Sequence, residues 1–139
     1  MTKNSKSIHG LSAKSYTDQQ FWDIECNTVL ADGWLFVGFV HEFLKPGDVI
    51  PISIAGKPIL LIKNNKDEII AFHNVCSHRC LKLVNETKNV GKIIQCPYHS
   101  WTYDLDGKLK ASPHFGGTNQ HTPKGFNKLD HGLKPIRIH

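Results

Sequence analysis

Two short pairs of cysteine and histidine in the middle of this chain constrain its fold more than any other feature. The pairs are Cys76-Ser77-His78 and Cys96-Pro97-Tyr98-His99, with seventeen residues between them. Thiolates favour iron and other soft transition metals, and neutral imidazole binds iron, copper or zinc. Four ligands of these two kinds predict a metal site that ties two loops together.

Two kinds of metal centre are compatible with this ligand set. A structural zinc site takes four Cys or His ligands, usually with about two to four residues inside a Cys pair and three to five inside a His pair. Here each pair combines one Cys with one His, and no helical pattern lies near His99. A [2Fe–2S] cluster with two thiolate and two imidazole ligands is the better match, and a zinc-binding interaction module is the weaker alternative.

The residues around both pairs resemble the cluster-binding loops of Rieske non-haem iron ring-hydroxylating oxygenases. The similar segments are 74–79 and 96–104, with further likeness at Tyr16-Thr17-Asp18, Gly33-Trp34, Pro46-Gly47-Asp48, 71–74 and 106–109. The chain thus resembles the N-terminal domain of the large (alpha) subunit of these enzymes. In that family a domain with a catalytic mononuclear iron follows.

The resemblance implies one Rieske-type [2Fe–2S] cluster per chain. Cys76 and Cys96 are expected to bind the inner iron, and His78 and His99 the outer iron. No catalytic residue is expected in this chain. The seven other histidines lack the spacing of the family's mononuclear-iron motif.

Four residues near the ligands are expected to support the cluster. The hydroxyl of Tyr103 is placed to donate a hydrogen bond to a ligand sulfur. Tyr98 and Trp101 are expected to exclude water, which affects the reduction potential. Arg79 follows a ligand directly, and its charge is expected to offset a reduced cluster or to contact a neighbouring subunit.

Cys80 and Ser100 depart from the family pattern, which has glycine at both positions. If either position needs a positive φ, a side chain there costs roughly 1–2 kcal/mol. Cys80 is interpreted as a bystander rather than a ligand. Respiratory-chain Rieske proteins brace the cluster with a disulfide between the two loops. That disulfide cannot form here, because Tyr98 stands where its second cysteine would be.

Short β-rich runs separated by turn residues predict an all-β fold, a small antiparallel β-sandwich or barrel with two cluster-binding loops. Strands are expected at 34–40, 49–54, 58–62, 68–72, 92–95, 100–103 and 132–138. One N-terminal helix is expected over about 17–31, from a capping-box pattern at Thr17 and apolar residues at helical spacing.

Four segments follow from this pattern. They are a flexible arm over 1–15, the helical lead-in over 16–34, the Rieske domain over 35–113, and a loop and strand over 114–139 that lead toward an absent catalytic domain. A chain of 139 residues is long enough for one domain.

Charge and composition limit the classes of partner that we expect this chain to bind. The chain carries 17 Lys and Arg against 12 Asp and Glu, a net charge of +5, without a run of basic residues. We therefore expect no nucleic acid. No apolar run reaches the length of a membrane span, and the polar N-terminus has no secretory signal, so we expect no membrane and a cytoplasmic location.

The leading hypothesis is one-electron transfer, with this chain as the domain through which electrons enter a Rieske oxygenase. The hypothesis takes the chain as a truncated form of that oxygenase, which acts on an aromatic or other small organic substrate. The expected partners are a reductase or ferredoxin donor and the mononuclear-iron catalytic domain. The alternative is a stand-alone Rieske-type ferredoxin. The helical lead-in and the tail at 126–138 favour the oxygenase, because small ferredoxins begin near the equivalent of Pro46.

Overall fold

The computed structural model describes residues 10–139 and divides the chain into two units. The first unit ends at Phe36, and the second runs from Val37 to His139. The expected arm over 1–15 lies mostly outside the described residues, and its last two residues belong to a helix. No helix within 10–139 is long and apolar enough to cross a membrane.

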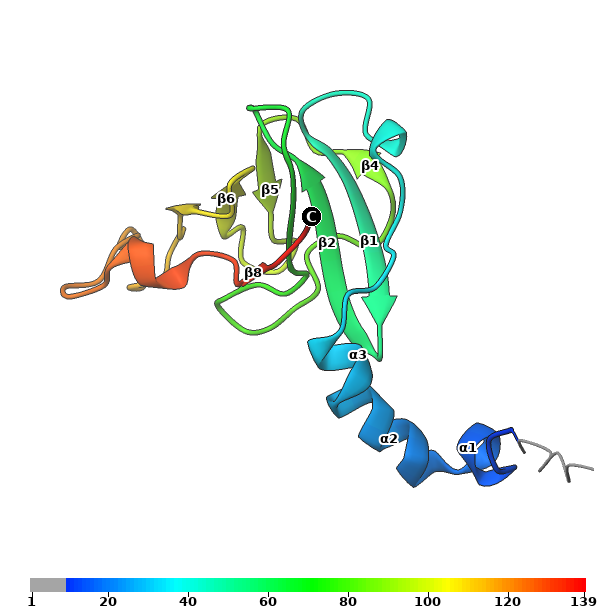
Figure 1. Cartoon of the computed structure of the whole chain (residues 1–139). Coiled ribbons are helices and arrows are strands. Elements are labelled where there is room, and N and C mark those ends of the chain that lie inside the picture. Colours follow the sequence, from blue (N-terminus) through cyan, green and yellow to red (C-terminus); the bar gives the residue numbers. More distant parts are fainter. Residues whose placement is uncertain (1–9) are drawn as a thin grey trace, which may run out of the picture. The chain divides into compact units, whose positions relative to one another are not determined.

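The first unit is helical, but the prediction of one continuous helix over 17–31 is wrong. It is three short helices, α1 (Lys14–Thr17), α2 (Gln19–Asn27) and α3 (Val29–Asp32) (Figure 1). Asp18 separates the first two because its backbone is extended, with φ −90° and ψ 120°. Its carboxylate accepts hydrogen bonds from the N–H groups of Gln20 and Phe21, so Asp18 rather than Thr17 is the N-cap.

Thr28 makes the second break. Its hydroxyl donates to the carbonyl of Ile24 at 2.7 Å, and its own N–H bonds only three residues back, to Glu25. A threonine that uses the carbonyl four residues earlier competes with the helical pattern. The backbone at Thr28 accordingly leaves the helical region, with φ −124° and ψ −86°.

Residues 34–40 do not form the expected strand. Gly38 has a φ of 146°, and the N–H of Phe39 donates to the carboxylate of Glu42 at 2.6 Å instead of to a neighbouring strand. The short 3-10 helix η1 (Val40–Glu42) follows. This apolar run is therefore irregular chain.

The larger sheet of the second unit has five antiparallel strands in the order β4-β1-β2-β3-β8. The strands are β1 (Asp48–Ile54), β2 (Lys57–Lys63), β3 (Ile69–His73), β4 (Lys88–Asn89) and β8 (Pro135–Ile136). Ala55 and Gly56 join β1 to β2 with positive φ at both positions, as a two-residue hairpin turn requires. The expected strands at 49–54, 58–62 and 68–72 correspond to β1, β2 and β3, whereas the two-residue β4 was not predicted.

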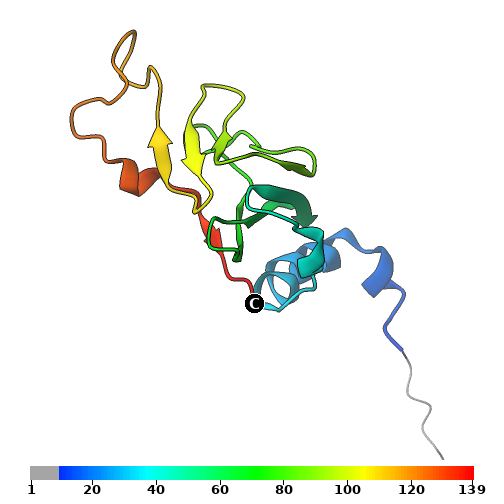
Figure 2. The same ribbon diagram turned by 90° about the horizontal axis from the view of Figure 1, so that it is seen from above.

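A second sheet has three antiparallel strands in the order β5-β6-β7. They are β5 (Ile93–Gln95), β6 (Thr102–Asp104) and β7 (Leu109–Ala111), and β6 begins two residues later than expected. The turn before β7 lies against the larger sheet at Gly107. This residue has φ 77°, and a Cβ there would lie 2.6 Å from the ring of Phe72. Figure 2 shows the two sheets as separate layers of the second unit.

The core has two parts, one on each face of the larger sheet. The central strand β2 is buried on both faces, since Leu60 and Ile62 belong to one cluster and Ile59 and Leu61 to the other. The first cluster also holds apolar residues of the second sheet and both site cysteines. After β7, a long segment leads through the 3-10 helix η2 (Lys128–His131) back to β8. The fold is the mostly antiparallel β architecture that the sequence predicts.

Candidate metal centre

Two loops with the same backbone pattern carry the Cys/His pairs. In the first loop, which follows β3, the N–H of Cys76 donates to the carbonyl of Leu81, and the N–H of Cys80 donates to the carbonyl of Cys76. The second loop, between β5 and β6, repeats both bonds from Cys96 to Trp101 and from Ser100 to Cys96. Each loop is thus a closed turn with a cysteine at its base.

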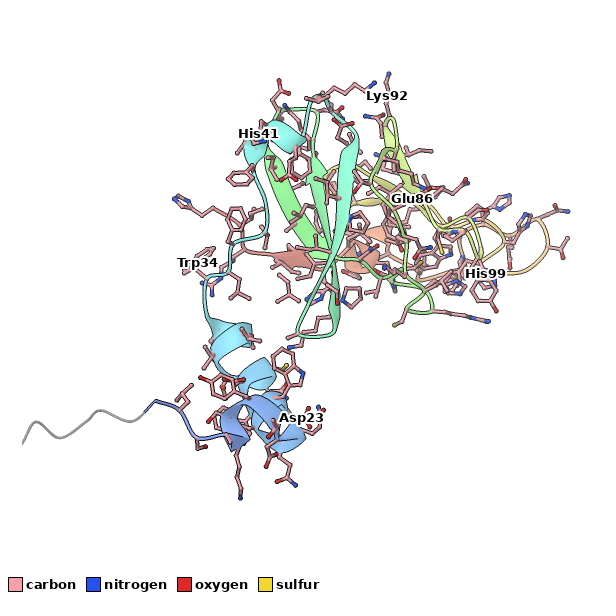
Figure 3. The ribbon with its side chains drawn as sticks, turned by 90° about the vertical axis from the view of Figure 1, so that its right-hand side faces the viewer. Asp23, Trp34, His41, Glu86, Lys92 and His99 are labelled. Atoms are coloured by element: carbon pink, nitrogen blue, oxygen red, sulfur yellow. The ribbon has the colours of Figure 1, made fainter. Side chains whose placement is uncertain are left out.

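The two turns bring the four expected ligands together. Cys76 and Cys96 are 2% and 3% exposed, and both are free thiols. The rings of His78 and His99 lie nearer the surface, with centroids 4.8 Å apart. Figure 3 shows His99 at one end of the second unit, far from His41. The sulfurs therefore lie inside and the imidazoles outside.

The electrostatics of these groups suit a metal centre. Burial raises the pKa of the Cys76 thiol, and the neighbouring Cys96 raises it further. Two thiolates side by side in the core need cations next to them. Burial lowers the pKa of His78, as do His99 and then Arg79, so its imidazole is neutral at pH 7, the form that binds metals.

Two buried side-chain nitrogens, Nδ1 of His99 and Nε1 of Trp101, have no hydrogen-bond partner within residues 10–139. Buried polar atoms are almost always paired. The indole N–H of Trp101 can only donate a hydrogen bond, whereas an imidazole nitrogen can bind a metal, so Nδ1 of His99 is the atom that fits a missing ligand such as iron. Among residues 10–139, no three His, Cys, Asp or Glu side chains are placed to hold one ion. A centre of two metal ions, one bound by the two cysteines and the other by the two histidines, would need only two protein ligands for each ion.

Tyr103 reaches the first loop from β6. Its hydroxyl lies 3.2 Å from Sγ of Cys76 and accepts a hydrogen bond from the N–H of Ser77 at 3.0 Å. Burial, and then the contact with Cys76, raises the pKa of Tyr103 well above its ordinary value. The hydroxyl therefore keeps its proton. A metal-bound Cys76 thiolate has no proton of its own, so towards such a sulfur the hydroxyl is the donor.

The other three supporting residues differ in burial. Trp101 is 1% exposed, and its ring is stacked on His78, with centroids 4.8 Å apart and planes 6° apart. Tyr98 is 58% exposed, but its ring lies 3.8 Å from that of His99. Arg79 is exposed. Trp101 therefore closes the interior side of the site, and Tyr98 covers part of its outer side.

Both departures from the glycine pattern lie at positive φ. Cys80 has φ 54° and Ser100 has φ 57°, and each occupies the same place in its loop. An L side chain in this region costs roughly 1–2 kcal/mol. The loops keep their shape nonetheless, because the hydrogen bonds described above close both turns.

Several residues of the site were not predicted from the sequence. Asn74 is fully buried and bonds to the backbone of Leu83 and Val84, which fixes the base of the first loop. Phe115 contacts the ring of His78 from a segment that has no recognisable motif. Asn74 stood inside the similar segment, whereas nothing in the spacing marked Phe115.

Comparisons with known proteins agree with this geometry. The Rieske [2Fe-2S] domain family matches residues 33–122. The oxygenase subunit of glycine betaine monooxygenase from Chromohalobacter salexigens is 34% identical over 138 residues, which cover 99% of this chain and 30% of that protein. This chain therefore spans less than a third of that relative.

Solved structures show the same likeness. A quaternary ammonium Rieske monooxygenase, solved in complex with its substrate L-carnitine, matches with a TM-score of 0.80 and 28% identity, over 91% of this chain and 34% of that one. Naphthalene 1,2-dioxygenase with indole bound in its active site matches with a TM-score of 0.75 and 30% identity, over 86% of this chain and 26% of that one.

Proposed function

The chain belongs to the family of Rieske [2Fe-2S] domains, and on this basis we propose that it carries single electrons through a cluster held by Cys76, His78, Cys96 and His99. The observation that carries the proposal is that two loops with the same backbone hydrogen bonds each supply one buried thiol and one imidazole, and that the two imidazoles are in contact. The unpaired Nδ1 of His99 supports iron ligation at that atom.

When bound, such a cluster supplies a one-electron centre whose potential depends on hydrogen bonds to sulfur and on solvent exposure. The chain's own residues control both. The Tyr103 hydroxyl lies 3.2 Å from the sulfur of Cys76 and donates to it once that sulfur is a metal-bound thiolate. Trp101 excludes water from the interior side of His78, and the half-buried imidazoles offer a path for the electron to the surface.

We further propose that this is the domain through which electrons enter a larger oxygenase. The relatives named above are oxygenases, and the match to the glycine betaine enzyme covers 99% of this chain, including the helical unit. A stand-alone ferredoxin would not need that unit. The partners in this proposal are a reductase or ferredoxin that supplies the electron and a catalytic domain with a mononuclear iron that receives it.

The substrate class in this proposal is a quaternary ammonium compound. Its support is the likeness to the glycine betaine and L-carnitine enzymes. The likeness to naphthalene 1,2-dioxygenase keeps an aromatic substrate as the second candidate. O2 consumption by the full oxygenase, with reductase and either glycine betaine or naphthalene supplied, separates the two. Uptake that depends on naphthalene alone would refute the quaternary ammonium proposal.

Metal and sulfide analysis of the purified chain tests the cluster proposal. We expect two irons and two acid-labile sulfides per chain. Replacing Cys76 or His99 by Ala is expected to abolish stable cluster binding, since in either variant one iron loses one of its two protein ligands. Cys26→Ala and Cys80→Ala are the matched controls and are expected to keep the cluster. One zinc without sulfide would rule out the proposal.

A further inference from the structure

Aromatic rings surround the imidazole of His78. Trp101 lies parallel to it at 4.8 Å, Phe115 meets it edge to face at 5.5 Å and 89°, and His99 lies at 4.8 Å and 68°. These are favourable arrangements for aromatic pairs. The plane of the His78 ring is therefore set by its neighbours as well as by its own loop.

Phe115 comes from outside both cluster loops. It lies in the segment 112–127, which leaves the second sheet after β7 and is drawn in yellow to orange in Figure 1. The segment has its own hydrogen bonds, from Oγ of Ser112 to the carbonyl of His121 at 2.9 Å and from the N–H of Gly116 to the carbonyl of Gln120 at 2.7 Å. A folded segment thus presents Phe115 to the site.

A further ring supports both neighbours of His78. Phe126 lies 4.8 Å from Phe115 and 5.8 Å from Trp101, and the ring of His131 is stacked on Phe126 at 4.5 Å. Phe115 therefore has Trp101 and Phe126 as ring neighbours in addition to His78. The contact with His78 is therefore one end of a packed aromatic series.

The two histidines of the site are held in different ways. In the part of the chain that the structure describes, the recorded ring contacts of His99 come from Tyr98 and His78, both in the cluster loops. His78 has Phe115 in addition, which stands 37 residues further along the chain. Only His78 thus depends on the segment after β7.

We propose that Phe115 is a positioning residue that fixes the plane of the His78 imidazole relative to the cluster. The proposal rests on the proposed function, because it assumes that His78 binds iron. Groups behind a metal-bound histidine orient its ring and tune the metal. A ring fixed in this way changes little when an electron arrives or leaves, so Phe115 holds the outer side of the centre in one geometry.

Three variants of Phe115 and one control test this role in the full chain. Phe115→Ala removes the ring, Phe115→Leu keeps part of its volume, and Phe115→Tyr restores a ring whose hydroxyl can reach water, because this side chain is 37% exposed. Phe43→Leu is the control, since Phe43 is 4% exposed in the core cluster on the other face of the sheet. The readouts are the EPR spectrum of the reduced protein, the two histidine nitrogen couplings, and the rate of cluster loss to an iron chelator.

We expect Phe115→Ala to change one of the two nitrogen couplings, to broaden the EPR lines, and to lose the cluster about threefold to tenfold faster. Phe115→Leu should fall between, and Phe115→Tyr should match the wild type. Phe43→Leu should lower the unfolding midpoint but leave both couplings unchanged. If Phe115→Ala fails to retain a cluster, the nitrogen couplings and line widths of the Leu and Tyr variants are compared with those of the wild type instead.

Two results would overturn the inference. One is a set of Phe115 variants with wild-type couplings and line widths, which would make the residue merely structural. The other is a Phe115→Tyr spectrum as perturbed as that of the Leu variant. A wild-type chain without iron and sulfide would instead defeat the proposed function, so the two failures are distinguishable.

Discussion

One tyrosine hydroxyl links strand β6 to the base of the first cluster loop. The oxygen of Tyr103 accepts from the N–H of Ser77 and lies 3.2 Å from Sγ of Cys76, to which the hydroxyl donates when that sulfur is a metal-bound thiolate. A hydrogen bond to a cluster thiolate stabilises the more negative, reduced state. For a cluster bound at Cys76, we therefore expect the hydroxyl of Tyr103 to raise the midpoint potential.

We predict that Tyr103→Phe lowers the midpoint potential. Hydrogen bonds to charged groups contribute about 1.5–3 kcal/mol, which is roughly 60–130 mV for one electron. Protein film voltammetry at pH 7 measures the shift. Tyr98→Phe is the control, because Tyr98 is 58% exposed and lies against His99 rather than a sulfur. An unchanged potential in Tyr103→Phe would show that this hydroxyl does not act on the cluster.

Cys80 and Ser100 give a second prediction at this scale, because both side chains stand at positive φ. Glycine removes that strain of roughly 1–2 kcal/mol but costs about 0.5–1 kcal/mol in chain entropy. We expect Ser100→Gly to stabilise the chain by about 0.5–1 kcal/mol in chemical denaturation, and Cys80→Gly to do the same. Ser100→Ala keeps the Cβ and should gain nothing. A glycine variant no more stable than the Ala variant would contradict the strain argument.

At the scale of elements, Asn74 connects the end of β3 to the far side of the first loop. Its side-chain oxygen accepts from the N–H groups of Leu83 and Val84, and its amide donates to the carbonyl of Val84 at 2.7 Å. All of these groups are buried. The side chain of Asn74 therefore adds three buried hydrogen bonds to the backbone bonds that close the loop that carries Cys76.

We predict that Asn74→Ala destabilises the chain by about 3–5 kcal/mol, since each buried polar group left unpaired costs about 1–3 kcal/mol. The variant should also lose its cluster faster than the wild type when it is diluted into denaturant. Chemical denaturation followed by the visible absorbance of the cluster measures both effects. Asn127→Ala, which removes an exposed cap of η2, should cost only about 1 kcal/mol. Equal losses in the two variants would argue against a special role for the buried amide.

The elements that depend on local signals were predictable from the sequence. β1 and β2 follow from two β-rich runs around Ala55-Gly56, and both cluster loops follow from ligand spacing within a few residues. The run at 34–40 misled because an apolar stretch has the same composition in a strand and in irregular chain. In the structure, the N–H of Phe39 donates to the carboxylate of Glu42 instead of to a strand, and hydrophobic periodicity does not predict such a bond.

Contacts between distant segments were not predictable. β4 has two residues and exists only because Asp48 and Val49 pair with it across some forty residues of chain. Phe115 reaches His78 for the same kind of reason, since β7 and the segment after it must be folded first. The sequence therefore identifies the four candidate ligands but not these supporting contacts, because such contacts carry no motif.

At the scale of the whole molecule, the chain combines a site for electron transfer with no histidine spacing suited to a second, catalytic iron. The mononuclear-iron motif of Rieske oxygenases places two histidines a few residues apart on a helix. The spacings between the histidines outside the cluster loops, such as His114 to His121, do not match that motif. His114 and His121 instead contact each other, with the N–H of His114 donating to Nδ1 of His121 at 3.1 Å.

We therefore predict that the purified chain accepts one electron per molecule but does not turn over substrate. Titration with dithionite, followed by EPR, should reduce one cluster per chain. With reductase, O2 and glycine betaine supplied, substrate should remain unchanged, because electron transfer alone does not activate O2. The control is the same assay with an oxygenase that carries both domains. Substrate loss catalysed by the purified chain, at a rate that disappears in Cys76→Ala, would show that these residues perform the oxidation themselves and would reject the division of labour proposed here.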